Sequence, residues 1–180
     1  MLGFLEYLNP AIAVAGLRQF LEMGGNVLVV IMAATFILWA MIVERYWYFW
    51  GAHRGVAKHA LSEWGTRSDH KSWQAHKIRD HLLSDVRINT EQNLGGIRAM
   101  VAVAPLLGLL GTVTGMVEVF DVMAFTGSSN ARAMASGVSK ATIPTMAGMV
   151  ASLSGLFFSA ALERRARREV QEVADKMVIE

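Results

Sequence analysis

Hydroxyl side chains lie inside two apolar stretches of the chain, where a lipid-facing helix does not need them. Thr112 lies in the run PLLGLLGTVTGMVEVF at residues 105–120, and Thr145 lies in a second apolar run at residues 141–161. At ~1.5 Å per residue, the two threonines lie ~18 Å and ~15 Å from the ends of two helices joined by a short polar break. A threonine hydroxyl can form hydrogen bonds but does not titrate near neutral pH. Such residues suit the lining of a path for a proton that another group carries.

The second apolar run carries further hydroxyls on one side of a helix. Thr142, Thr145, Ser152 and Ser159 recur at spacings that a period of 3.6 residues places on one face. Pro144 removes a backbone donor beside Thr145 and can kink the helix. Two interpretations stay open: the hydroxyls line a proton path, or each donates to a carbonyl of its own helix. The candidate pore-lining residues are Thr112, Thr145, Thr142 and Ser152.

Small residues form a surface on the first of the two helices. Gly111 and Gly115 are four residues apart, a spacing that lets helices approach closely. Packing alone is the favoured interpretation of the glycines, because such surfaces commonly serve helix contacts. The candidate packing residues are Gly108, Gly111, Gly115, Pro144 and Gly148.

Three charged residues lie near the outer ends of the same helices. Glu118 and Asp121 are three apart and share a helical face, which is turned by about 120° or more from Thr112. A carboxylate costs roughly 2.5–3.5 kcal/mol at the centre of a membrane helix, so something should offset that cost. We expect Lys140 to form an ion pair with Glu118 or Asp121. A structural ion pair, a charged vestibule and a functional role all stay open for these charges.

The composition narrows the class of protein. The chain has 180 residues, is 53% hydrophobic and contains no cysteine, which indicates a single membrane domain without disulfides or thiolate sites. The spacings of the five histidines do not place two ligands four residues apart, so we expect no metal site and no cofactor. The sequence also shows neither a catalytic nucleophile paired with a general base nor a phosphate-binding loop, so we do not expect an enzyme. The basic residues flank apolar segments, which favours membrane topology over nucleic-acid binding.

The elements that must position these side chains are helices. The run GGNVLVVIMAATFILWAMIV at residues 24–43 is long enough to cross ~30 Å of hydrocarbon. The sequence therefore predicts an all-α membrane protein with three transmembrane helices and long cytoplasmic helical extensions, joined near residues 65–72. The predicted segments are an external amphipathic segment (1–23), the first transmembrane helix (24–50), a cytoplasmic helical region (51–96), the second transmembrane helix (97–123), a short periplasmic connection (124–137), the third transmembrane helix (138–162) and a cytoplasmic basic tail (163–180).

The amino-terminal segment and the orientation follow from charge. A secretory signal peptide competes with an interfacial helix at residues 1–23, but a positively charged leader is missing. Most Lys and Arg residues fall in the region 51–96, beside it at Arg45 and in the tail, whereas the opposite side has only Arg18, Arg132 and Lys140. The positive-inside rule therefore places the loop and the tail in the cytoplasm and the amino terminus outside.

The motif APLLGLLGTVTG at residues 104–115 resembles the pattern A-P-x-x-G-L-x-G-T-V-x-G of the ExbB/TolQ/MotA family of proton-channel proteins, and within it the ExbB branch. Residues 137–148 are similar to the third-helix pattern G-x-x-x-A-x-x-x-T-x-x-G. The resemblance covers residues 97–163. It implies that Thr112 and Thr145 are pore-facing. Lys140 departs from the family, in which many members have a glutamate five residues before the threonine.

The resemblance also implies partners and a location. We expect a multi-pass protein of the bacterial inner membrane, with a periplasmic amino terminus, that forms a homopentamer around an ExbD-like single-span protein. Proton flow would then energise a TonB-like protein for outer-membrane transport. A TolQ-like role in envelope maintenance is the alternative within the family, and a structural membrane scaffold is the alternative from another class.

Overall fold

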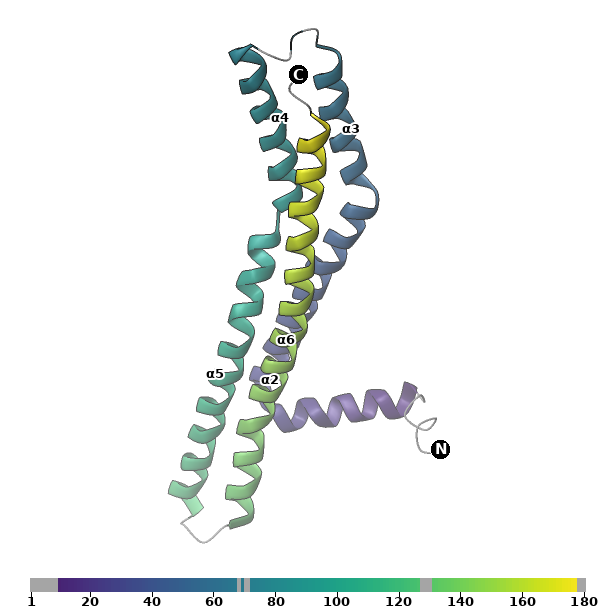
Figure 1. Cartoon of the computed structure of the whole chain (residues 1–180). Coiled ribbons are helices and arrows are strands. Elements are labelled where there is room, and N and C mark those ends of the chain that lie inside the picture. The colour runs from purple at the N-terminus through teal and green to yellow at the C-terminus, as the bar shows by residue number, and fades with distance from the viewer. Residues whose placement is uncertain (1–9, 68, 70–71, 127–130, 178–180) are drawn as a thin grey trace. The chain divides into compact units, whose positions relative to one another are not determined.

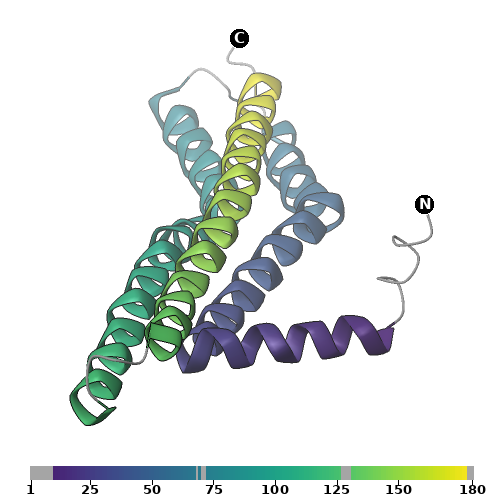
Figure 2. The same ribbon diagram turned by 90° about the horizontal axis from the view of Figure 1, so that it is seen from below.

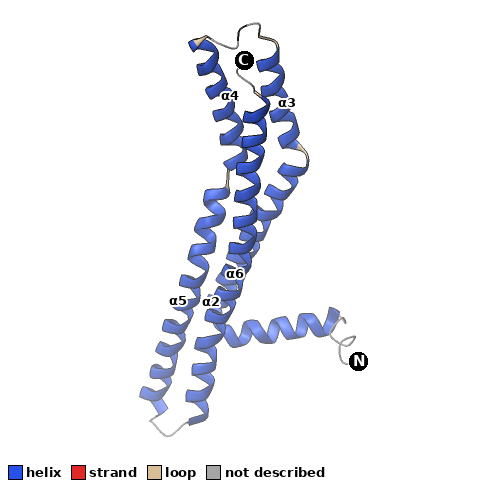
Figure 3. Ribbon diagram, viewed as in Figure 1, coloured by secondary structure: helices blue, strands red, loops and turns tan. Residues whose placement is uncertain are grey.

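The structure is a computed structural model that describes residues 10–67, 69, 72–126 and 131–177. Parts of the predicted amino-terminal segment, cytoplasmic region, periplasmic connection and tail lie outside these residues. All regular structure in the described residues is helical (Figure 3). The chain is therefore an all-helical protein, as its sequence predicts.

Five helices follow one another along the described chain (Figure 1). They are α2 (Pro10–Trp50), α3 (Ala52–Gly65), α4 (Trp73–Glu91), α5 (Leu94–Thr126) and α6 (Ala131–Lys176). The predicted join near residues 65–72 is confirmed, because α3 ends at Gly65 and α4 begins at Trp73. Helices α5 and α6 extend beyond the apolar runs, since backbone hydrogen bonding does not stop where side chains become polar.

Three helical stretches are long and apolar enough to cross a membrane. They are Gly24–Trp50, Trp73–Phe125 and Met134–Lys176. Many of their large apolar side chains are exposed in the single chain, including Leu106, Val113 and Leu153. Contiguous exposed apolar surface is rare on soluble monomers and suits lipid or another protein. The chain is a multi-pass membrane protein.

Local signals explain where the helices around α4 begin and end. The Ser72 hydroxyl accepts a hydrogen bond from the backbone N–H of Ala75 at 3.1 Å, which satisfies one of the free donors at the start of α4. After α4, Asn93 adopts a positive φ of 63°, a left-handed conformation that asparagine tolerates better than most residues. Its carbonyl then accepts from the N–H of Ile97, in the first turn of α5.

The described helices form two compact units. The first, here called the hairpin unit, comprises Met1–Ile37 and Met100–Leu153. The second, here called the bundle unit, comprises Leu38–Ala99 and Ser154–Glu180. Helices α2, α5 and α6 contribute residues to both units.

The bundle unit has a small apolar core of its own. In Figures 1 and 2, the end of α6 runs between α3 and α4. Val86 and Ala75 of this core are fully buried. Burial of a side chain as large as that of Val86 stabilises a fold by roughly 1.5–3 kcal/mol. Arg79 of α4 fixes the last turn of α6: Nε donates to the Met177 carbonyl and Nη2 to the Ala174 carbonyl, each at 3.0 Å. The buried core residues of the bundle unit are Ala60, Trp64, Ala75, Leu82, Val86, Val173 and Met177.

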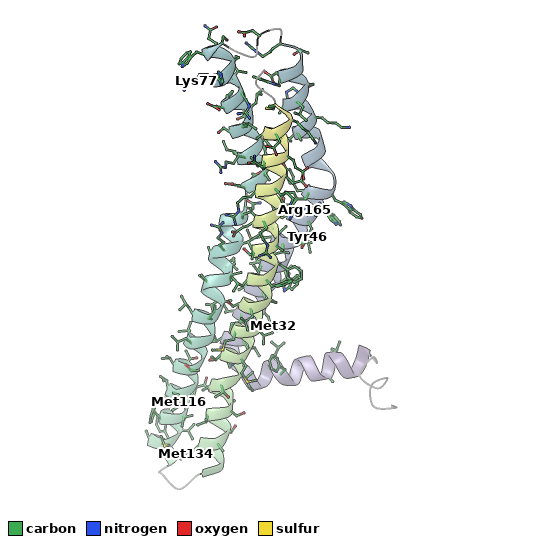
Figure 4. All side chains as sticks on the ribbon, in the orientation of Figure 1. Met32, Tyr46, Lys77, Met116, Met134 and Arg165 are labelled. Carbon is green, nitrogen blue, oxygen red and sulfur yellow. The ribbon has the colours of Figure 1, made fainter. Side chains whose placement is uncertain are left out.

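In the hairpin unit, residues 100–126 of α5 and 131–153 of α6 run side by side in opposite directions (Figures 1 and 2). Met116 of α5 and Met134 of α6 lie toward the same end, near the connection (Figure 4). Helix α2 bends at Gly25, which has φ 65° and ψ −167°, so its first part leaves the hairpin sideways. This conformation is accessible to glycine at little cost.

Candidate functional site

Glycines let the two helices of the hairpin touch through their backbones. A Cβ added at Gly148 would lie 2.6 Å from the Ala104 carbonyl oxygen, and one at Gly115 would lie 2.7 Å from the Ala141 Cα. A Cβ at Gly108 would lie 2.9 Å from the Thr145 Cα. These distances are below ordinary contact, so only glycine fits at this separation of the helices.

Two hydroxyls of α6 bond across this close contact to carbonyls of α5. Thr145 Oγ1 donates to the Gly108 carbonyl at 2.9 Å, and Ser152 Oγ donates to the Val101 carbonyl at 3.0 Å. Pro105 explains the second bond, because its nitrogen carries no hydrogen and the carbonyl four residues earlier, that of Val101, loses its usual helical donor. Ser152 supplies the missing donor from the neighbouring helix.

The other hydroxyls donate within their own helices. Thr112 Oγ1 donates to the Leu109 carbonyl at 2.7 Å, and Thr142 Oγ1 donates to the Ser139 carbonyl at 3.0 Å. The local bonding that the sequence left open therefore applies to Thr112 and Thr142, whereas Thr145 and Ser152 join the two helices. In all four the hydroxyl hydrogen is engaged, but the oxygen can still accept a hydrogen bond. Their role as pore-lining residues stays a prediction.

A cavity of about 260 Å³ lies beside the bend of α2. Asn26 of α2, Thr114 and Glu118 of α5, and Lys140 of α6 line it. On α5, the cavity-lining residues Gly111, Thr114, Gly115 and Glu118 follow the spacing of a single helical face. The bent helix α2 and helix α6 therefore meet a face of α5 with small side chains, and both polar and apolar groups line the space between them.

Within the described helices, the predicted ion pair of Lys140 is not formed. Lys140 and Glu118 line the same cavity, yet among the described residues no ion pair within 4.0 Å joins Lys140 to Glu118 or to Asp121. Asp121 is exposed and is not one of the cavity-lining residues. The helical phase accounts for the correction: Ala141, and not Lys140, is the residue of α6 that packs directly against Gly115 of α5.

Comparison with known proteins decides the family. A model of the MotA/TolQ/ExbB proton channel family matches residues 51–175. The chain belongs to this proton channel family. The ExbB-like 1 protein of Synechocystis sp. is 43% identical to it over 63 residues, which cover 33% of this chain and 25% of that protein. The ExbB-like 3 protein of the same organism is 36% identical over 64 residues, which cover 34% of this chain and 30% of that protein. The alignments thus span less than a third of the length of these curated relatives.

The bundle unit buries an arginine that closely follows the first apolar run of the sequence. Arg45 lies just after the apolar run at residues 24–43, a position typical of an anchor at the membrane interface, but the residue is only 2% exposed. Its Nη1 donates to the Asn89 carbonyl in the last turn of α4 at 3.3 Å, and its guanidinium contacts the Glu44 carboxylate. The open carbonyls at a helix end and an adjacent carboxylate offset the cost of burying this charge.

Besides Arg45, the bundle unit contains a cluster of three charged side chains at the start of the basic tail: Arg98, Glu163 and Arg167. Arg98 Nε donates to the Glu163 carboxylate, and Arg167 Nη2 lies 3.6 Å from the other carboxylate oxygen. The hydrogen bond from Arg98 is the main cause that lowers the pKa of the Glu163 carboxyl from its ordinary value of 4.5. Arg98, Glu163 and Arg167 also line a cavity of about 410 Å³ in the bundle unit.

Sequence reasoning did not predict that Asn26 and Thr114 line the same cavity as Glu118 and Lys140. The pair Gly24–Gly25 before an apolar run was the available signal, because adjacent glycines permit a bend where a helix would otherwise continue. The second signal was the helical spacing that places Gly111, Gly115 and Glu118 on one face of α5. Neither signal reveals by itself that the two segments enclose a cavity.

Proposed function

We propose that this chain is the channel subunit of an inner-membrane complex that uses the proton motive force, with an ExbD-like single-span protein as its partner. The observation that carries the proposal concerns the charges of the hairpin. Between Arg98 and Glu118 on α5, and between Lys140 and Glu163 on α6, the sequence has no ionisable side chain. These intervals correspond to roughly 30 Å of helix at ~1.5 Å per residue.

This chain supplies no side chain that could hold a proton along that distance, because hydroxyls do not bind an extra proton near neutral pH. The carrier must come from a partner, and a carboxyl group is the simplest choice. Thr112 and Thr145 already donate their hydrogens to carbonyls, so their oxygens would accept a hydrogen bond from the protonated acid. The hairpin would thus hold the neutral form of the carrier inside the membrane, where an ionised form is costly.

The energy available suits a mechanical step. One proton that crosses ~100 mV releases ~2.3 kcal/mol, enough to bias a conformational equilibrium by about fifty-fold. We propose that this energy reaches a TonB-like protein and that the subunits form a homopentamer with a periplasmic amino terminus. The exposed apolar faces of α5 and α6 support self-association, and the Lys and Arg distribution supports the orientation.

A structural scaffold is the second candidate, because the hydrogen bond from Thr145 to Gly108 and the glycine contacts would also serve packing alone. Replacing Thr145 by Val separates the two functions. The matched control is Thr145→Ser, which keeps a hydroxyl at the same position. Partner-dependent proton flux is measured in proteoliposomes with a pH-sensitive dye, and assembly is measured by native mass spectrometry.

A channel subunit predicts that Thr145→Val lowers flux while the complex stays assembled, and that Thr145→Ser retains flux. Full flux in Thr145→Val would contradict the proposed function and favour the scaffold. Native mass spectrometry of the complex extracted with the products of neighbouring genes tests the partner and counts the subunits. A complex without any single-span partner would also contradict the proposal.

A further inference from the structure

The cavity beside the bend of α2 combines polar side chains with interrupted backbone. Gly25 breaks the regular helix where α2 lines the cavity. Pro144 carries no N–H, so the carbonyl of Lys140, another lining residue, lacks its usual donor four residues later. Irregular backbone inside a membrane is tolerated where protein buries it or where it lines a water-filled cavity.

The size and lining of the cavity favour water. Liquid water takes about 30 Å³ per molecule, so a space of about 260 Å³ holds several molecules. Glu118 and Lys140 line it without a mutual ion pair within 4.0 Å in the described part of the chain, and Asn26 and Thr114 add an amide and a hydroxyl. Water in this space would hydrate both charges and could donate to the Lys140 carbonyl, which Pro144 leaves without its usual helical donor.

The cavity also has a closed end. A Cβ at Gly111 would lie 2.4 Å from the Pro144 Cβ and 3.4 Å from Val27 Cγ1, so these three residues pack tightly. Farther along the hairpin the hydroxyl of Thr145 is engaged with the Gly108 carbonyl. Water that entered beside Glu118 would therefore meet this packed layer before it reached the Thr145 hydroxyl.

We infer that this cavity is a hydrated vestibule that opens to the outer aqueous side and brings protons to Glu118. A hydronium ion that reaches the carboxylate would protonate it and leave one water molecule. The described charged groups facing the vestibule are Glu118 and Lys140, while α2 contributes the neutral Asn26. The direction of opening and the use of the proton rest on the proposed function; the hydration of the cavity does not.

Cysteine labelling tests the hydration directly. The chain contains no cysteine, so single-cysteine variants need no background change. Thr114→Cys and Asn26→Cys place a thiol in the cavity from two different helices. Val113→Cys is the matched control, because Val113 is the adjacent residue of α5, is 56% exposed and does not line the cavity. The probe is a membrane-impermeant anionic methanethiosulfonate, added to sealed right-side-out or inside-out vesicles.

We expect both cavity thiols to react from the outer side at least about tenfold faster than Val113→Cys, because the reactive thiolate needs water. Equal rates for the cavity and control positions would overturn the inference, and so would reaction from the inner side alone. If Thr114→Cys does not accumulate, Asn26→Cys gives the same comparison. Labelling does not require flux, so its failure is distinguishable from failure of the proposed function.

The role of Glu118 has its own test in the complex with its partner. Glu118→Gln should lower the proton flux about tenfold if the carboxylate relays protons, since the amide does not titrate. Asp121→Asn removes the acid one turn farther along α5, outside the cavity, and should leave flux unchanged. Equal flux in Glu118→Gln and wild type would overturn the relay role, while equal losses in both variants would indicate an effect of net charge instead.

Discussion

The contact at Gly148 makes the sharpest prediction about the hairpin. Its replacement by Ala would place a Cβ 2.6 Å from the Ala104 carbonyl oxygen and 3.3 Å from the Gly108 Cα. Ordinary contact begins near 3.4 Å, so the helices must move apart locally by about 0.8 Å. The obstacle is backbone, which cannot rotate away as a flexible side chain can.

That movement also affects the two hydrogen bonds between the helices. The Thr145 bond to Gly108 is 2.9 Å and the Ser152 bond to Val101 is 3.0 Å. A separation of about 0.8 Å would take both beyond ~3.5 Å, where a hydrogen bond no longer forms. Overpacking costs typically 1–3 kcal/mol and each lost bond about 0.6 kcal/mol in membranes, whereas alanine restores up to ~1 kcal/mol of helix propensity. The expected net destabilisation is about 1–3 kcal/mol.

Unfolding of the purified protein in mixed detergent, followed by circular dichroism, measures this loss. Gly95→Ala is the matched control on α5, because a Cβ there meets nothing within 4 Å. It should leave stability unchanged or raise it. A double-mutant cycle with Ser152→Ala then tests the mechanism: the serine substitution should cost less in the Gly148→Ala background, where its bond is already lost.

The reasoning fails if Gly148→Ala is as stable as the wild type. It also fails if Ser152→Ala has the same cost in both backgrounds, since the helices would then have kept their separation. Destabilisation of the Gly95→Ala control by a similar amount would show that glycine at these positions matters for a reason other than close contact.

Two further predictions concern the bundle unit. Arg79→Met should release the last turn of α6 and raise its amide hydrogen exchange, because two hydrogen bonds to its carbonyls are lost, whereas Lys77→Met should not; equal exchange in both variants would contradict this role. The lowered pKa of Glu163 means that its ion pair with Arg98 stabilises the protein above the ordinary value of 4.5 and that this contribution is lost as pH falls through the lowered pKa. Glu163→Gln should therefore weaken the loss of thermal stability as pH falls below about 4.5, measured as the unfolding temperature at a series of pH values. An unchanged dependence of the unfolding temperature on pH would refute a stabilising role of the ion pair between Arg98 and Glu163.

The roles of individual polar residues show where sequence reasoning stops. The stripe Thr142, Thr145 and Ser152 follows from helical period, but the period does not say which hydroxyl bonds across to α5 and which bonds locally. Pro105 leaves the Val101 carbonyl without its helical donor, and only the structure shows that Ser152 donates to it. Arg45 follows an apolar run, which is typical of an anchor, yet the end of α4 buries it.

The sequence by itself determined the helical class, the three apolar stretches and the lack of titratable groups between the charged ends of the hairpin. These properties depend on composition and local periodicity, which the chain carries whatever its neighbours do. The tertiary structure decided the acceptors of the hydroxyls, the absence of the ion pair between Lys140 and Glu118, and the cavity at Gly25. Those depend on how closely helices approach and where a backbone bends, which are set by contacts between residues more than 80 positions apart, such as Val27 and Gly111.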